Sequence, residues 1–372
     1  MISSEELYNQ HIQEMFGTTS IENLTESETD RILNRLLLCL PNNGKLYKYR
    51  SIDGDAFENA YDGLEKGYLY MAKASTLNDD MDSVLTFDPE IEVIKTADYF
   101  FENPWLFLAE WVRANSDKQI FRNMYDKYTY DKLIACVDRE NFIMDYSKAI
   151  PFLMSEGVTD DQACEYINKI ESYTNALIEQ SREKVELSTS NFVNFNRINR
   201  ENIYVFSMTE DYDSNAMWGL YANSNKGFCI EYDFKKAKLF SIELKKKIIN
   251  TYKVIYREKL EEFSFLDMHK YVLTGKTNQE LLKKANMDML SKLITKQMDW
   301  KYEKEWRIFL CNLDDENKIY ADMVSEIIID ERALQEDNAA LLIDLATLRD
   351  WTIKIRKSNK SATGHIYEEY KH

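Results

Sequence analysis

The spacing of hydrophobic and polar residues divides the chain into helical stretches and strand-like runs. Apolar residues recur at helical spacing over residues 3–40 and over most of residues 90–195. Strand-like runs lie on either side of the second stretch, at residues 45–50, 68–72, 203–208, 228–234, 325–329 and 351–355. Helices and strands that occur in separate groups are typical of an α+β protein. The pattern therefore predicts a sheet interrupted by a large helical insert.

This pattern also predicts the domain organisation. We expect N-terminal helices at residues 1–40 and a sheet domain in two parts, at residues 41–90 and 196–356. A helical insert at residues 91–195 separates the two parts, and residues 357–372 form a frayed tail. Within the sheet domain, residues 247–255 are β-like, and amphipathic helices are predicted over residues 256–272 and 277–297. These helices lead into the segment that begins at Trp300.

That segment, residues 300–310, combines charged and aromatic residues in an unusual way. In a strand, alternation places Glu303, Glu305 and Arg307 on one face. Two like charges two residues apart repel each other, so a purely structural strand has no use for them. A site that stabilises a developing cation does need such a pair. The alternative is a solvated ion pair between Glu303 and Arg307 on an edge strand.

Composition narrows the classes of partner. The chain of 372 residues carries 64 acidic and 47 basic side chains, a formal net charge of −17. This balance disfavours bulk electrostatic binding to nucleic acid or to an anionic membrane. Five cysteines without paired spacing predict free thiols in a reducing cytosol. No signal-peptide pattern and no apolar run of membrane-spanning length occur, so we expect a cytoplasmic protein.

Metal binding is not expected from the sequence. Only four histidines occur, and none has a metal-ligand spacing with a cysteine or another histidine. The loop Asn78–Asp82 is acidic but lacks the regular spacing and closing glutamate of an EF-hand. A turn or a helix cap is the favoured interpretation of this loop.

Several short motifs together resemble a known family. They are Lys48-Tyr49-Arg50-Ser51, Leu77-Asn78-Asp79, Met217-Trp218 with Tyr221, Lys226-Gly227, and the run from Trp300 to Arg307. In this combination they look like the bacterial "domain of unknown function 2971" family, over most of residues 45–310 outside the helical insert. That family carries no established activity.

The order of the motifs more distantly resembles the ADP-ribosyltransferase superfamily. The resemblance implies a split, mostly antiparallel sheet and NAD⁺ as substrate, with no metal. It implies Arg50 as the first motif, Ser207 as the second and Glu305 as the third, with Glu303 as the upstream acid. The chain departs from the superfamily in two ways. It has Phe206-Ser207-Met208-Thr209 where a Ser-Thr-Ser triplet is usual, and a long segment separates the first two motifs.

The resemblance also implies roles for the side chains. Glu305 would accept a hydrogen bond from the ribose 2′-hydroxyl and so stabilise an oxocarbenium-like transition state. Glu303 would deprotonate or orient the acceptor. Arg50 would hold a diphosphate by a forked contact. Ser207 would hydrogen-bond ribose or orient Glu305, although such a hydroxyl is commonly bonded to backbone. Stacking on nicotinamide is assigned to Tyr49, Trp218 or Tyr221.

Structural alternatives exist for several of these residues. Arg50 has acidic neighbours in Asp53 and Asp55, and an ion pair with either would need no ligand. Trp218 and Tyr221 lie three residues apart, which is also the spacing of a helix face buried in a core.

The leading functional hypothesis is an ADP-ribosyltransferase-like enzyme. It would cleave the nicotinamide–ribose bond of NAD⁺ and transfer ADP-ribose to a macromolecule or water. A protein acceptor or partner is favoured over nucleic acid because of the acidic charge. Bacterial enzymes of this class are often toxins or phage-defence effectors. The alternatives are a non-enzymatic protein-interaction or regulatory module built on the helical insert, and a metal-dependent hydrolase using Asp79, Asp80, Asp82 and the two glutamates. Oligomeric state and acceptor identity are left open.

Overall fold

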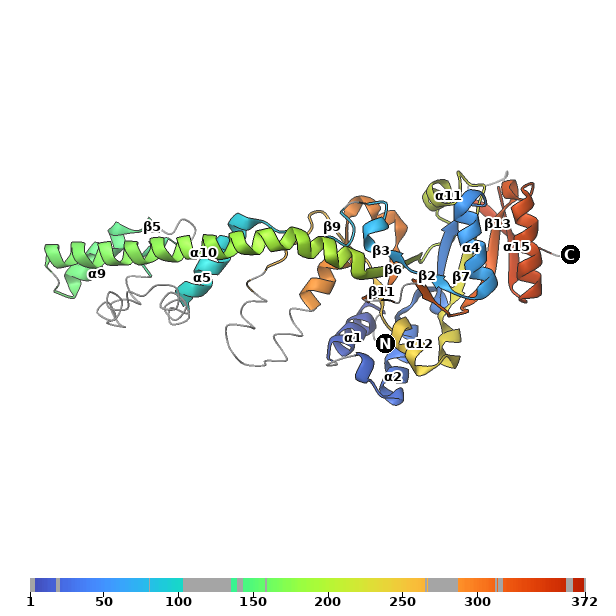
Figure 1. Ribbon diagram of the computed structural model, residues 1–372, viewed down its shortest axis with the longest axis horizontal. Helices are drawn as coiled ribbons and strands as arrows, with labels where there is room; N and C mark the ends of the chain where they lie inside the picture. The colour runs from blue at the N-terminus through green and yellow to red at the C-terminus, as the bar shows by residue number, and fades with distance from the viewer. Residues whose placement is uncertain are drawn as a thin grey trace. The chain divides into compact units, whose positions relative to one another are not determined.

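The computed structural model describes residues 4–17, 21–79, 81–102, 135–138, 143–157, 159–264, 266, 287–311, 313, 317–358 and 364–370. The chain divides into two compact units. The first comprises residues 1–85, 196–261 and 286–372, and the second residues 86–195 and 262–285. The N-terminal helices therefore belong to the same unit as the sheet. Figure 1 traces the elements of both units.

The first unit is built on a nine-stranded sheet. Eight strands follow the order β15 (His365–Glu369), β14 (Thr352–Ser358), β13 (Val324–Asp330), β7 (Phe228–Asp233), β1 (Lys45–Arg50), β6 (Ile203–Thr209), β11 (Glu305–Cys311) and β8 (Thr251–Lys253). The ninth, β3 (Ala72–Lys73), also pairs with β6. The pairing of β13 with β14 is parallel, and the other pairings in this sheet are antiparallel. The predicted α+β class with a mostly antiparallel sheet is confirmed.

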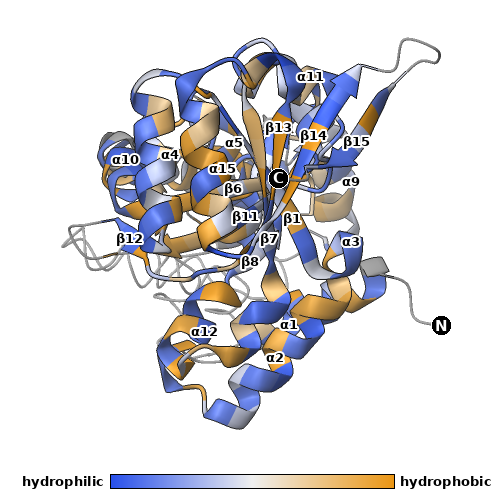
Figure 2. Ribbon diagram, turned by 90° about the vertical axis from the view of Figure 1, so that its right-hand side faces the viewer, coloured by the Kyte–Doolittle hydropathy of each residue, from blue (hydrophilic) through white to orange (hydrophobic). Residues whose placement is uncertain are grey.

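Side-chain alternation gives the sheet two different faces. Leu46 belongs to the main apolar core, whereas Tyr47 and Tyr49 belong to a smaller aromatic cluster on the other side. The main core is covered by α2 (Glu26–Cys39), α4 (Gly54–Lys66), α12 (Ile242–Ile248) and α15 (Asp337–Leu348). The helix α11 (Asn215–Tyr221) covers the aromatic cluster. Figures 1 and 2 show α4 and α15 beside the strands, with apolar residues in orange along α15.

The remaining elements of the first unit are short, apart from α1 (Ser4–Gly17). They are α3 (Pro41–Gly44), β2 (Leu69–Tyr70), β9 (Ile255–Arg257), β10 (Thr295–Gln297), β12 (Lys318–Ile319) and the 3₁₀ turns η1 (Ile21–Asn23), η2 (Ala74–Thr76), η3 (Phe234–Leu239), η4 (Met298–Glu303) and η5 (Glu331–Ala333). Thr25 and Glu28 form a reciprocal capping box that fixes the start of α2.

The second unit is mainly helical where it is described. It contains α5 (Pro89–Glu102), α9 (Tyr146–Ser155) and most of α10 (Asp160–Asn202), together with the short strands β4 (Val137–Asp138) and β5 (Ile143–Met144). Phe263 joins this unit through its backbone N–H, which donates to the carbonyl of Thr86 at 2.6 Å. The last residues of α10, from Asn196 onward, belong to the first unit and lead directly into β6.

Two sequence predictions of secondary structure in this region are confirmed only in part. Residues 247–255 begin as the end of α12 and only then form β8 and the start of β9. The amphipathic helices predicted over residues 256–272 and 277–297 are replaced at their outer ends by β9 and β10, which pair in parallel. Residues 287–293 are helical, and residues 267–286 lie outside the described part of the chain. Tertiary pairing here overrides the weak helical pattern.

The C-terminal segment is also more ordered than the sequence predicts. Instead of a frayed tail, residues 365–369 form β15, which pairs antiparallel with β14. The cross-strand ion pair of Lys357 and Glu368 contributes to this edge, with 2.5 Å between the charged atoms. The preceding residue, Arg356, forms a buried ion pair with Asp330 at 2.6 Å.

We expect Asp330→Asn to destabilise the first unit because it leaves the buried Arg356 guanidinium without its charged partner. Loss of one member of a buried ion pair costs about 3–5 kcal/mol. Urea denaturation measures this change, with Glu368→Gln at the exposed pair as the control that leaves the midpoint unchanged. Equal midpoints for the two variants would contradict the expectation.

Candidate functional site

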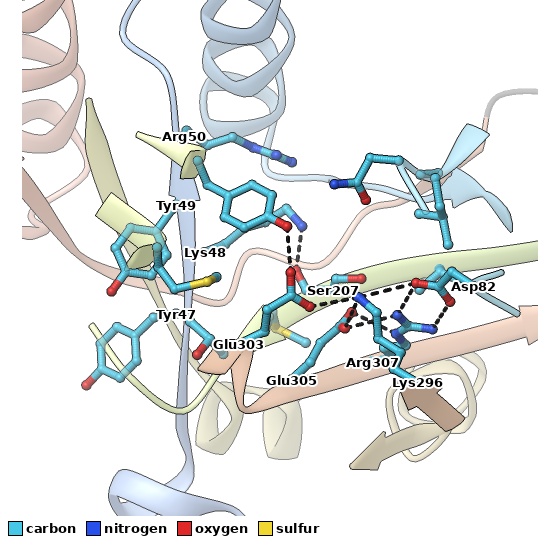
Figure 3. Close-up of a pocket in the computed structure, with 18 of the residues that line it drawn as sticks. Tyr47, Lys48, Tyr49, Arg50, Asp82, Ser207, Lys296, Glu303, Glu305 and Arg307 are labelled. Carbon is cyan, nitrogen blue, oxygen red and sulfur yellow. Dashed lines mark hydrogen bonds and ion pairs between the residues drawn. The ribbon is translucent and has the colours of Figure 1, made fainter. Parts of the chain in front are cut away.

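A cavity of about 220 Å³ lies where the sheet opens between β1 and β6. These two strands pair only at Tyr47 and Thr209. Further along β6, Val205 pairs with Ala72 of β3 instead. The strands therefore diverge, and the gap between them is lined by side chains from β1, β2, β3, β6, α11, β10, η4 and β11, together with the loop after η2 (Figure 3).

Most of the predicted site residues line this cavity. They are Arg50, Ser207, Glu303, Glu305, Tyr49 and Tyr221. Because Tyr47 and Thr209 are paired, they project from the same face of the sheet. Lys48 and Arg50 therefore leave β1 on the opposite face from Ser207 of β6. The opening of the sheet is what allows residues of opposite faces to line one space.

Arg307 bridges two carboxylates at the floor of the cavity. Its Nε and Nη2 atoms donate to the two oxygens of Glu305 at 2.7 and 2.9 Å. Its Nη1 and Nη2 atoms donate to the two oxygens of Asp82, each at 2.6 Å. The guanidinium is 1% exposed, so it clamps two carboxylates out of contact with water. Ser207, which lies opposite Arg307 in the strand register, also lowers the pKa of Glu305.

Lys296 is the second cation of this cluster. Its Nζ atom lies 2.7 Å from Glu303, 3.2 Å from Glu305 and 3.4 Å from Asp82. The ammonium also lies 4.9 Å from the ring centroid of Trp300. Two cations thus serve three carboxylates, which leaves one formal negative charge in excess when all three acids are ionised.

The two glutamates respond to this imbalance in opposite ways. Burial alone would raise the pKa of Glu305, but the charges of Arg307 and Lys296 outweigh it and hold that pKa well below its ordinary value. Burial, and then the charge of Glu305, raise the pKa of Glu303 despite its contact with Lys296. Glu305 is therefore the permanently charged acid, and Glu303 is the one that exchanges a proton more readily.

Glu303 does not lie on the predicted strand. It ends the 3₁₀ turn η4, and Lys304 follows in the left-handed region with φ +44°. The turn nevertheless directs the carboxylate into the cavity, where Tyr221 Oη donates to Glu303 Oε1 at 2.5 Å. The alternative of a solvated surface pair with Arg307 is wrong, because both residues are buried and contact different partners.

The opposite wall of the cavity is cationic. Lys48 Nζ donates to the carbonyl of Ser207 at 2.5 Å and lies 4.5 Å from the ring centroid of Phe206. Burial, and then the charge of Arg50, lower the pKa of the Lys48 amine. Burial also lowers the pKa of Arg50. Within the described residues, the Arg50 guanidinium has neither a hydrogen bond nor an ion pair.

The alternative in which Arg50 pairs with an adjacent aspartate is not realised. Asp53 instead accepts a hydrogen bond from Asn223 Nδ2 at 2.5 Å. The backbone of Arg50 is itself tightly packed, since a Cβ atom at Gly227 would lie 2.2 Å from the Arg50 carbonyl oxygen. Only glycine permits this approach, which explains the predicted Lys226–Gly227 turn physically.

The aromatic residues divide between cavity and core. Trp218 does not line the cavity, which agrees with the alternative of a helix face buried in a core and not with stacking on nicotinamide. Its indole is wholly buried, donates to the carbonyl of Tyr212 at 2.9 Å and lies under the guanidinium of Arg356. Tyr49 packs edge-on against Trp218, and its hydroxyl donates to the carbonyl of Asp211 at 2.7 Å. The ring of Tyr49 therefore borders the cavity but packs against the core. Tyr221 points its hydroxyl into the cavity, toward Glu303.

Sequence reasoning missed the residues that complete the cluster. Lys296 fell inside a predicted helix, and nothing in its local pattern indicates contact with three carboxylates. Asp82 was considered only as part of a metal loop, but its carboxylate is fully engaged by Arg307. Asp80 of that loop lies outside the described residues. Lys48 was noted only as part of a family motif.

A metal-binding cluster and a membrane-spanning helix are both absent from the described residues. No group of three or more His, Cys, Asp or Glu side chains among the described residues has an arrangement suited to a metal ion. In the same part of the chain, no helix combines the length and apolar character needed to cross a bilayer.

Comparison with known proteins identifies one family. The model of the family described as "Protein of unknown function (DUF2971)" matches residues 217–308. The predicted resemblance to this family is thereby confirmed over that segment, which holds most of α11, the Gly227 turn, Lys296 and the two glutamates. The matched segment does not include the motifs around Arg50 and Asn78. No curated protein and no solved structure matches the chain.

We expect Glu305→Gln to destabilise the first unit strongly. The substitution leaves the buried Arg307 and Lys296 with one charged partner fewer, and loss of one member of such a pair costs about 3–5 kcal/mol. Chemical denaturation measures the change. Glu326→Gln is the matched control, because Glu326 is buried and paired at 2.7 Å with Lys354, whose side chain is 38% exposed. A Glu305→Gln variant as stable as the parent would contradict the expectation.

The raised pKa of Glu303 predicts a specific pH dependence of stability. The folded protein binds this proton more tightly than the unfolded chain, whose glutamate titrates at the ordinary value of 4.5. Relative to a Glu303→Gln variant, the parent should therefore lose stability as pH rises above 4.5 and through the folded pKa of Glu303. Urea midpoints of both proteins measured from pH 4 to 8 test this, and a pH-independent difference would refute it.

Proposed function

We propose that this cavity binds NAD⁺ and cleaves its nicotinamide–ribose bond, with transfer of ADP-ribose to a macromolecule or to water. The observation that carries the proposal is the convergence of Arg50, Ser207 and Glu305 on one cavity. These three residues lie on β1, β6 and β11 and are separated by up to 255 residues of sequence. An enzyme of this kind needs these three residues at one cavity.

The electrostatics of the cavity support a ligand of this kind. Arg50 offers a guanidinium that has no ion pair among the described residues and is suited to phosphate oxygens. The facing wall holds three carboxylates against two cations, which favours a positive charge near Glu303. NAD⁺ presents both features, because its diphosphate is anionic and charge develops at the ribose anomeric carbon when nicotinamide departs.

The contacts assign different roles to the two glutamates from those implied by the resemblance. Glu305 already accepts two hydrogen bonds from Arg307 and one from Lys296, so few of its acceptor positions are open. Glu303 accepts one from Tyr221 and one from Lys296. In this proposal Glu303 faces the reacting sugar, and Glu305 positions Arg307 and Lys296 behind it.

The proposed reaction breaks one bond at the anomeric carbon and forms another. The bond from the anomeric carbon to the nicotinamide nitrogen breaks, and its electron pair leaves with nicotinamide. The carboxylate of Glu303 stabilises the cationic sugar. An oxygen of water or of the acceptor forms the new bond to the anomeric carbon and passes its proton to Glu303.

The size of the cavity limits how much of the ligand it holds. Pockets that enclose a whole drug-sized ligand measure about 300–1,000 Å³. At about 220 Å³, this cavity is suited to the nicotinamide–ribose end alone. The rest of the dinucleotide must extend beyond Arg50.

The test is release of nicotinamide when the purified protein is incubated with NAD⁺, with and without cell lysate as a source of acceptor. We expect Glu303→Gln to lower kcat by about 10²–10³, because it removes a charge that acts in the transition state. Arg50→Ala should mainly raise KM. Glu326→Gln, which alters a buried acid outside the cavity, is the control that retains full activity.

The alternative of a non-enzymatic interaction module predicts a different outcome. In that case no nicotinamide is released under either condition, and Glu303→Gln changes stability but no cellular phenotype. Absence of release from folded protein in the presence of lysate, or full activity of Glu303→Gln, would overturn the proposed function.

A further inference from the structure

A second cavity adjoins the first at Arg50. It has a volume of about 370 Å³ and lies between α4, β2, β6 and β7, on the face of the sheet that carries the main core. Arg50, Tyr70 and Ala72 belong to the walls of both cavities. The opening of the sheet between β1 and β6 therefore has a chamber on each side, with the Arg50 guanidinium where they meet.

Three polar groups in the wall of this second cavity lack a partner in the described part of the chain. The first is the guanidinium of Arg50. The second is the hydroxyl of Tyr232, whose side chain is buried beside Arg50. The third is Asp322 Oδ1, a buried oxygen without a hydrogen bond, in a carboxylate whose other oxygen lies 3.7 Å from the guanidinium of Arg349 and whose side chain is 42% exposed. Buried polar groups are normally satisfied, and a Tyr hydroxyl usually finds a partner. A ligand that donates to Asp322 and contacts Tyr232 and Arg50 would satisfy all three.

The rest of the wall is apolar and aromatic. Phe206 packs edge-on against Tyr232, with 5.4 Å between the ring centroids. Tyr68, Leu64 and Ala60 complete the opposite side. A chamber with aromatic walls and a few unsatisfied polar groups at its edge is suited to a flat heteroaromatic ring that carries hydroxyls.

We propose that this second cavity binds the nucleoside half of the dinucleotide. The base lies among the aromatic walls, a ribose hydroxyl donates to Asp322, and the phosphates lie at Arg50 between the two chambers. The inference rests on the proposed function for its choice of NAD⁺, but it assigns a separate site. It also explains how a first cavity of about 220 Å³ can serve a whole dinucleotide, because that cavity then holds only the nicotinamide–ribose end.

Calorimetric titration tests this assignment with three probes: AMP, ADP-ribose and nicotinamide mononucleotide. AMP and ADP-ribose should bind the parent protein. Tyr232→Phe should weaken both by roughly threefold to tenfold, the effect of one lost hydrogen bond. Asp322→Ala should weaken them by at least as much. Neither substitution should change the affinity for nicotinamide mononucleotide, which does not reach this cavity.

The matched control is Tyr252→Phe. Tyr252 is a buried tyrosine on β8 outside both cavities, and its hydroxyl donates to Asn250 at 3.1 Å. It should leave all three affinities unchanged. Tyr232→Phe is a conservative change at a hydroxyl with no partner among the described residues, so it remains informative if Asp322→Ala folds poorly.

The outcomes separate this inference from the proposed function. Selective loss of AMP and ADP-ribose binding without any nicotinamide release from NAD⁺ would support a nucleotide site and overturn the enzymatic proposal. Nicotinamide release with AMP affinity unchanged in Tyr232→Phe and Asp322→Ala would overturn the second site and leave the enzyme intact. Failure of AMP and ADP-ribose to bind the parent protein would also overturn the second site.

Discussion

The structure around the cavity depends on Arg307. This buried guanidinium forks to Glu305 on its own strand and to Asp82 in a loop 225 residues earlier in the sequence. A buried cation is costly unless its hydrogen bonds are satisfied, so its presence forces both carboxylates into place. Lys296 then extends the cluster to Glu303. One ion-pair network thereby joins β11, β10, η4 and the loop after η2 around a single space.

The charge imbalance of this network makes the stability of the first unit depend on the protonation of Glu303. Three carboxylates and two cations have a mismatch that a proton on Glu303, or a positive ligand, can neutralise. The fold tolerates the mismatch because Glu303 is the least constrained member, bonded only to Tyr221 and Lys296. The opposite wall has the complementary mismatch, because Arg50 has no charged partner in the part of the chain that the structure describes. Unmatched charges of opposite sign across one cavity are more economically explained by a polar ligand than by packing alone.

The opening between β1 and β6 gives the site its geometry. A continuous ladder would have kept Lys48 and Arg50 on one face of the sheet and Ser207 on the other. Because the strands separate after a single pair, side chains from both faces reach the gap. The backbone groups released from this ladder are partly satisfied by other means, since the Ser207 carbonyl accepts from Lys48. The close approach at Gly227 fixes the end of β1 beside the opening.

The sequence by itself determined the α+β class, most strands of the sheet, the α11 helix and the candidacy of Arg50, Ser207 and Glu305. The class, the strands and α11 follow from alternation, apolar runs and local turn residues, which are local signals. The candidacy of Arg50, Ser207 and Glu305 follows from the resemblance of the motif order. Only the tertiary structure decided that Trp218 belongs to the core, that Glu303 lies on a turn, and that Lys296 and Asp82 join the cluster. The physical reason is that charge pairing between distant segments leaves no periodic pattern along the chain. Lys296 was assigned to a helix because its neighbours have helical spacing, whereas its ion pairs and the pairing of β10 with β9 hold it in a strand.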